Sequence, residues 1–92
     1  MKYRILTTHQ FEKSLKRCVK RNLKIDKLQK VLSILAEDGS LPMEYRPHKL
    51  VGFAGNNTWE CHIQPDWLLV WEQHDDLLTL LLINTGSHSD LF

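Results

Sequence analysis

The stretch from Trp59 to Trp71, WECHIQPDWLLVW, constrains the fold more than any other part of the chain. Strand-forming residues lie on both sides of Pro65-Asp66, a dipeptide that favours a tight turn. The run Leu68-Leu69-Val70 is continuously apolar, as expected of a strand that is buried on both faces. We therefore predict a buried β-hairpin with strands near residues 58–64 and 67–73.

The N-terminal part of the chain predicts a strand and two helices. Residues 2–6 have the composition of a short strand, and Thr7 or Thr8 can cap a helix over residues 9–21. Asp26 and Gln29 have capping-box spacing, so a second helix is expected to run from there to Gly39. The apolar positions at helical spacing, which predict the buried faces, are Phe11, Leu15, Cys18 and Val19 on the first helix and Leu28, Val31 or Leu32, and Leu35 on the second.

After the helices the composition changes to turn-forming residues and then to strands. Pro42 and Pro47 exclude a long helix or a central strand, so residues 45–50 are expected to form a loop or a sheet edge. A further turn is favoured by Gly52, Gly55, Asn56 and Asn57. Residues 77–83 predict a last strand, and residues 84–92 are expected to leave the sheet in about one helical turn. The order β-α-α-β-β-β predicts a single α+β domain over residues 1–92, with a helical hairpin packed on one face of a small, mostly antiparallel sheet.

Charge is distributed unevenly although the net charge is only +1. Residues 1–31 hold ten Lys and Arg against two acids, a net charge of +8, whereas residues 32–92 hold two against nine, a net charge of −7. A basic half suggests an anionic partner, either nucleic acid or an acidic protein segment. No apolar run is long enough to cross a bilayer, and two cysteines without a CxxC spacing do not suggest a disulfide scaffold, so we expect no membrane association and a cytoplasmic location.

Candidate acid–base residues are spread over three segments that can converge. His48 lies in the Pro-flanked segment, His62 on the hairpin and His88 in the terminal segment. Glu60 lies two residues before His62 and therefore on the same face of the strand, and Asp66 lies in the hairpin turn. Several imidazoles with one or two carboxylates offer both a proton acceptor and a proton donor near neutral pH.

Three segments carry a resemblance to a known family: PHKL at 47–50, WECHIQPDWLLV at 59–70, and TGSHSDLF at 85–92. They resemble the YafQ branch of the RelE-type toxins, the ribosome-dependent mRNA endonucleases of bacterial type II toxin–antitoxin systems. The resemblance covers nearly the whole chain and implies a RelE-like fold. It also implies that the 2′-OH of mRNA attacks the adjacent phosphate in the ribosomal decoding site without a metal or another cofactor.

The resemblance implies roles for individual residues. The catalytic candidates are His48, His62, Asp66 and His88. Asp66 or His48 is expected to be the base and His88 the acid, while His62 orients the phosphate or a neighbouring carboxylate. The candidates for RNA contact are Arg46, Lys49 and Phe92, the last by stacking on a base.

Two positions depart from the family pattern. Relatives commonly carry Arg before the Thr-Gly of the terminal motif, where this chain has Asn84, and Glu60 stands where they often have Asp. Loss of a guanidinium that faces developing phosphate charge is expected to lower the rate by ~10²–10³, by analogy with loss of one oxyanion donor. Asn84 and Glu60 are therefore supporting candidates, and Arg46 or Lys49 could replace the missing charge.

Three functions remain open from the sequence. The first is the nuclease, with a DinJ/RelB-like antitoxin, the ribosome and mRNA as partners and operator DNA bound only through the antitoxin complex. The second is a toxin-fold binding module that keeps its partners but has lost useful cleavage, as Asn84 suggests. The third is a metal-dependent hydrolase that uses His48, His62, Asp66 and His88 as ligands.

Overall fold

A five-stranded mixed sheet in the order β1-β5-β4-β3-β2 forms the framework of the computed structural model, which describes residues 2–50 and 57–92. β1 pairs with β5 in parallel, and the other pairs are antiparallel. The elements are β1 (Arg4–Thr7), α1 (His9–Lys20), α2 (Ile25–Asp38), β2 (His48–Lys49), β3 (Thr58–Gln64), β4 (Trp67–His74), β5 (Thr79–Gly86) and α3 (His88–Leu91). The predicted α+β class is confirmed, with the edge segment contributing β2. Of the turn expected at Gly52, Gly55, Asn56 and Asn57, all but Asn57 lies outside the described residues.

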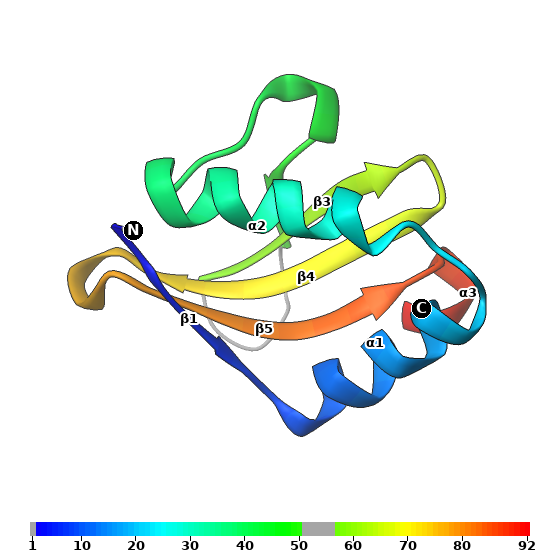
Figure 1. Ribbon diagram of the computed structural model, residues 1–92. Coiled ribbons are helices and arrows are strands. Elements are labelled where there is room, and N and C mark those ends of the chain that lie inside the picture. The colour runs from blue at the N-terminus through cyan, green and yellow to red at the C-terminus, as the bar shows by residue number, and fades with distance from the viewer. Residues whose placement is uncertain (1, 51–56) are drawn as a thin grey trace.

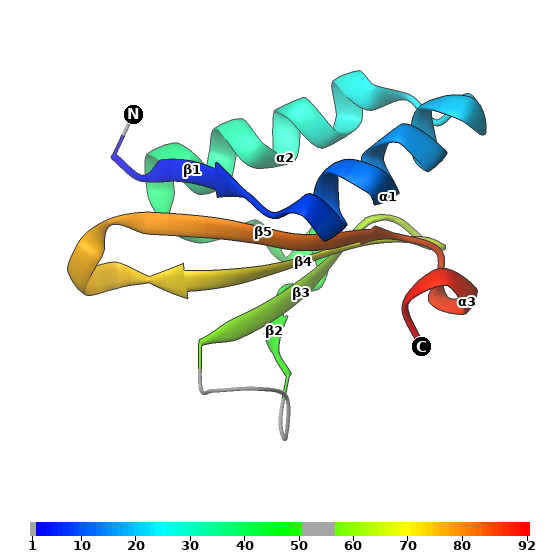
Figure 2. The same ribbon diagram turned by 90° about the horizontal axis from the view of Figure 1, so that it is seen from below.

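The two long helices lie on one face of the sheet, and α3 lies on the other. Figure 1 shows α1 and α2 following one another across the strands, and Figure 2 shows α3 with the C-terminus beyond the opposite face. Thr8 caps α1 as predicted, because its Oγ1 accepts a hydrogen bond from the backbone N–H of Phe11. The layers therefore leave part of one sheet face for the terminal helix.

β4 is the central strand of the core. Residues 67–71 are all at most 3% exposed, which confirms the prediction of a strand buried on both faces. The side chains of β4 that face the long helices are those of Trp67, Leu69 and Trp71. Trp59 stacks on Trp71, with ring centroids 6.3 Å apart. Burial of large apolar side chains stabilises by about 1.5–3 kcal/mol each, so this strand supplies much of the stability.

Alternation along β3 separates apolar packing residues from ionisable ones. Cys61 and Ile63 are buried in the core on the helix side. Glu60 and His62 therefore face the opposite side of the sheet. Because His48 pairs with Glu60 in the register of β2 and β3, these side chains meet on the face that the long helices leave uncovered.

Three expectations about element ends and faces were wrong. α2 begins at Ile25 with Lys24 as N-cap and no side-chain cap, so Asp26 lies inside the first turn and makes no capping box. Val19 is 53% exposed because it lies eight positions after Phe11, about 80° around the helix. The last strand runs from Thr79 to Gly86 and not over residues 77–83, because a 3₁₀ turn occupies residues 75–77 and pairing with β4 continues as far as Gly86.

Gly39 is fixed by its backbone and by its neighbours. Its φ of +68° ends α2 in the left-handed conformation, and a Cβ there would lie 2.6 Å from Cε1 of Tyr3. The Tyr3 hydroxyl donates to Oδ1 of Asp75 at 2.7 Å, so the ring cannot move aside without breaking that bond. The end of α2 and the turn after β4 are therefore coupled through one ring.

We predict that Gly39→Ala lowers the free energy of unfolding by about 1–3 kcal/mol, because the backbone strain and the contact with Tyr3 add. Urea unfolding followed by tryptophan fluorescence measures the change. Ser40→Ala, at the exposed next position, is the control and should stay within about 0.5 kcal/mol of the wild type. Equal stability of the two variants would contradict the prediction.

Candidate functional site

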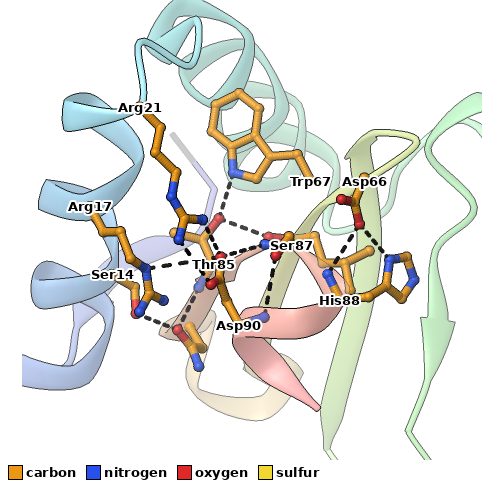
Figure 3. A network of polar contacts seen from close by, with 11 residues as sticks. Ser14, Arg17, Arg21, Asp66, Trp67, Thr85, Ser87, His88 and Asp90 are labelled. Carbon is orange, nitrogen blue, oxygen red and sulfur yellow. Dashed lines mark hydrogen bonds and ion pairs between the residues drawn. The ribbon is translucent and has the colours of Figure 1, made fainter.

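The hairpin turn and the start of α3 bring Asp66 and His88 together. Oδ1 of Asp66 lies 2.8 Å from Nδ1 of His88 and accepts a hydrogen bond from the His88 backbone N–H at 3.2 Å (Figure 3). Both side chains are more than half exposed, so the pair is open to a ligand. The side-chain and backbone hydrogen bonds from His88 lower the pKa of the Asp66 carboxyl below its ordinary value.

His62 lies beside this pair. Its ring centroid is 5.7 Å from that of His88, with the two rings tilted by 47°. Nδ1 of His62 lies 3.3 Å from the backbone oxygen of Pro65, and since a carbonyl oxygen only accepts, the ring hydrogen belongs on Nδ1. In the neutral ring, Nε2 then keeps a lone pair that can accept a proton.

A second histidine–carboxylate pair lies across β2 and β3. Nε2 of His48 is 3.3 Å from Oε1 of Glu60, and its Nδ1 is 3.1 Å from the backbone oxygen of Arg46. The Glu60 side chain is only 7% exposed, and within residues 2–50 and 57–92 its Oε2 is a buried atom without a hydrogen-bond partner. Both ring nitrogens of His48 thus face oxygen acceptors, which fix the orientation of the ring.

The position of His88 depends on contacts that the sequence did not predict. The Asp90 carboxylate binds Nη1 and Nη2 of Arg21 at 2.5 and 3.2 Å, and Nε of Arg17 lies 3.9 Å away (Figure 3). Oδ2 of Asp90 also accepts from the backbone N–H of Ser87, which closes a capping box around the first turn of α3. The Arg21 hydrogen bond is the main reason that the pKa of Asp90 is strongly lowered. The basic helix α1 therefore holds the segment that carries His88.

Gly86 and Thr85 fix the chain where it leaves β5. Gly86 has a φ of +154°, and a Cβ there would lie 2.8 Å from Oδ2 of Asp90. The Thr85 hydroxyl accepts from Nε1 of Trp67 at 2.9 Å and donates to the Leu68 carbonyl oxygen at 2.7 Å. The contacts with Asp90, Trp67 and Leu68 thus explain why the tail motif has Thr and Gly at positions 85 and 86.

Asn84 is bound to helix α1. Its Oδ1 accepts from the Ser14 hydroxyl at 2.5 Å and from the Thr85 backbone N–H at 2.9 Å. Asn84 also borders, with Phe92, a small apolar cavity of about 60 Å³. Phe92 is 65% exposed, so its ring is available for stacking, and its predicted contact with RNA stays a prediction.

The two basic candidates lie on different sides of the site. Arg46 lines a cleft of about 280 Å³ together with His62 and Pro65. Lys49 places its Nζ 5.7 Å from the ring centroid of Trp59, on the face opposite to His48. Arg46 is therefore grouped with the acid–base residues, and Lys49 is not; both remain predictions as RNA contacts.

The described residues give no support to a metal site, a membrane-spanning helix or a nucleophilic Cys61. In the part of the chain that is described, no three His, Cys, Asp or Glu side chains are arranged to hold a metal ion. In the same residues no helix is long and apolar enough to cross a membrane. Cys61 is fully buried, and burial raises its pKa to about 12, which makes it a poor nucleophile.

Residues 3–92 match the family described as the bacterial toxin of type II toxin–antitoxin systems, YafQ. The chain belongs to this family, and the resemblance predicted from its three motifs is confirmed.

Individual relatives agree in sequence and in fold. The mRNA interferase toxin YafQ of Escherichia coli K12 is 32% identical over 84 residues, which are 90% of this chain and 88% of that protein. The crystal structure of a metal-bound toxin from Helicobacter pylori is 39% identical, covers 100% of both chains and superposes with a TM-score of 0.88. The E. coli DinJ–YafQ complex gives 31% identity, 98% coverage of both chains and a TM-score of 0.88.

We predict that His88→Ala raises the pKa of the Asp66 carboxyl toward its ordinary value, because the ring hydrogen bond is the largest cause of its lowering. The rise should be incomplete, since the backbone N–H at position 88 still donates. NMR titration of the carboxyl carbon measures it. His74→Ala, which removes a ring paired with Glu72, is the control and should leave Asp66 unchanged. No shift in the first variant would contradict the described pairing.

We predict that Asp90→Asn lowers the free energy of unfolding at pH 7 by about 1.5–3 kcal/mol, the range for hydrogen bonds to charged groups. A lowered pKa stabilises the fold above the pKa of the unfolded carboxyl, about 3.9, and this stabilisation is lost as the pH falls below it. The difference in the free energy of unfolding between variant and wild type, measured by urea titration, should therefore become smaller as the pH is lowered from 5 to 2. Ser89→Ala, exposed on the same helix, should show no such narrowing.

Proposed function

We propose that the protein is a ribosome-dependent endoribonuclease that cleaves translated mRNA without a metal ion. The observation that carries the proposal is the Asp66–His88 pair with the His62 ring beside it, in a chain of this toxin family. Relatives that match over 90% of this chain and 88% of their own length are named mRNA interferase toxins. Cleavage by the 2′-OH needs a base, an acid and positive charge near the phosphate, and the site offers a group for each.

His88 is proposed as the acid. Asp66 accepts from Nδ1 of His88 and is held ionised by its lowered pKa, so the hydrogen bond orients the His88 ring with Nε2 directed away from Asp66. Nε2 of His88 can then donate its proton to the departing 5′ oxygen. The same lowered pKa makes Asp66 a weak base, so we assign it to the orientation of His88 and not to proton abstraction.

His62 is proposed as the base in place of Asp66 or His48. With Nδ1 donating to the Pro65 carbonyl oxygen, Nε2 is left to accept the proton of the 2′-OH. The 2′ oxygen forms a bond to phosphorus while the bond from phosphorus to the 5′ oxygen breaks. The products are a 2′,3′-cyclic phosphate and a free 5′-OH, and the two histidines exchange their protonation states.

His48 is proposed to support the site from β2. Its two ring nitrogens contact the Arg46 carbonyl oxygen and the buried Glu60 carboxylate, so both are engaged within the protein and neither is free to take the proton of the 2′-OH. Arg46, which lines the same cleft as His62, is proposed to supply part of the charge stabilisation that an arginine at position 84 would give.

The proposed partners follow from the relatives. The E. coli YafQ toxin is found in a complex with DinJ, and we propose a DinJ/RelB-like antitoxin as the partner of this chain. Ribosomes and mRNA would be its other partners in the cytoplasm, and operator DNA would be bound only through the antitoxin complex. The charge of residues 1–31, ten Lys and Arg against two acids, supports an anionic partner.

One observation favours a second function. Asn84, at the position of the family arginine, has its Oδ1 bound to Ser14 and to the Thr85 backbone and brings no positive charge. A binding module that retains the antitoxin but cleaves poorly would fit this substitution.

We predict that purified protein cleaves mRNA on programmed ribosomes, and that His88→Ala lowers the single-turnover rate by about 10²–10⁴ because the acid is lost. Asn84→Arg should raise the wild-type rate by up to about 10²–10³, the usual value of one charge-stabilising donor. His74→Ala, a histidine paired with Glu72 away from the site, is the matched control and should retain wild-type cleavage.

The outcomes separate the functions. Cleavage by the wild type that is lost in His88→Ala supports the nuclease. No cleavage by the wild type, with cleavage gained in Asn84→Arg, supports the binding module. Cleavage that disappears when a metal chelator is added under conditions that keep ribosomes intact would contradict the metal-independent mechanism.

A further inference from the structure

The cleft beside His62 continues into a second cleft. The first, of about 280 Å³, is lined by Arg46, His62 and Pro65 among others. The second, of about 240 Å³, is lined by Lys27 and Lys30 of α2. Both clefts share Glu44, Tyr45 and Ile63, so they adjoin one another. We refer to the two together as the groove, which extends from His62 to the long helix α2.

The two ends of this groove are basic. Lys27 and Lys30 are exposed and three positions apart on α2, so they present their ammonium groups on one side of the helix. Arg46 lies at the end nearest His62 and is also exposed. The two clefts have volumes of about 280 and 240 Å³, slightly below the range of about 300–1,000 Å³ for pockets that hold a whole small molecule.

The middle of the groove is not basic. Tyr45 is partly buried against the core, so its ring is held in place at the junction of the two clefts. Glu44 is exposed beside it and would repel a phosphate, but its carboxylate can accept a hydrogen bond from the exocyclic amino group of a base. An aromatic ring with a carboxylate is thus arranged for a base, between cations arranged for phosphates.

We propose that this groove, Lys27–Lys30–Glu44–Tyr45–Arg46, binds the single-stranded RNA that adjoins the scissile phosphate, with a base on Tyr45 and Glu44. The assignment rests on the proposed nuclease function and deepens it. It predicts a preference for cytosine over uracil at that base, because cytosine carries an amino group where uracil carries a carbonyl oxygen. An acidic protein segment fits less well, since Glu44 would face it in the middle of the groove.

The test measures binding of 2′-O-methylated hexanucleotides, which cannot be cleaved, by fluorescence anisotropy over a range of KCl concentrations. Lys27→Gln/Lys30→Gln should weaken binding about tenfold and reduce the slope of log K against log salt by about 1.4, for two phosphate contacts with single-stranded RNA. Lys13→Gln/Lys16→Gln removes the same charge from α1 outside the groove and should retain binding. Tyr45→Leu should weaken binding about tenfold, whereas Tyr45→Phe retains the ring and should bind normally.

Base preference gives an independent measurement. Wild-type protein should bind oligo(C) several-fold tighter than oligo(U), and Glu44→Gln should reduce that ratio. An equal loss of RNA affinity in the two double-lysine variants would overturn the proposal, because it would show that RNA is attracted by the overall positive charge and not by the groove. Unchanged RNA binding with weakened binding of the antitoxin would assign the groove to an acidic protein segment. The oligonucleotides report on binding alone, because they cannot be cleaved. If the groove binds them but the protein does not cleave mRNA on programmed ribosomes, the nuclease function is refuted and the RNA-binding site is retained.

Discussion

Burial of β4 on both faces is the constraint on which the other elements depend. The strand places Trp67 and Trp71 under the long helices and Leu68 and Val70 toward the opposite face, and all four are at most 3% exposed. Its neighbours β3 and β5 carry His62 and the start of the terminal segment. A rigid central strand thus sets the distance between the two parts of the site, and rigid support is what acid–base geometry requires.

Most of the fold could be predicted because its signals are local. Alternation along 58–64, the continuous apolar run after Pro65 and the left-handed Gly39 each determine structure within a few residues. The errors arose where local signals competed or depended on tertiary packing. Asp26 could cap a helix but lies inside one. Val19 fits the apolar stripe of its helix, but its side chain points away from the sheet and is 53% exposed.

The site was predictable in its members but less so in its geometry. Motif resemblance named His62, Asp66 and His88, and the structure brings their side chains together. The contact of Arg21 with Asp90 joins residues 69 apart, and no pattern in the sequence indicates it. The capping box of Ser87 and Asp90 is a local motif, so its spacing could have been recognised in the sequence. The long-range contact with Arg21 could not.

The contacts that complete the site also have a consequence for folding kinetics. Hydrogen bonds link Thr8 to Leu82, Ser14 to Asn84 and Arg21 to Asp90, with separations of 69 to 74 residues. Closing such long loops costs entropy before any contact forms, so chains rich in them fold slowly. Because the contacts that hold His88 are among the most distant in sequence, a chain that is only partly folded has no assembled site. The site therefore assembles only when these long loops have closed.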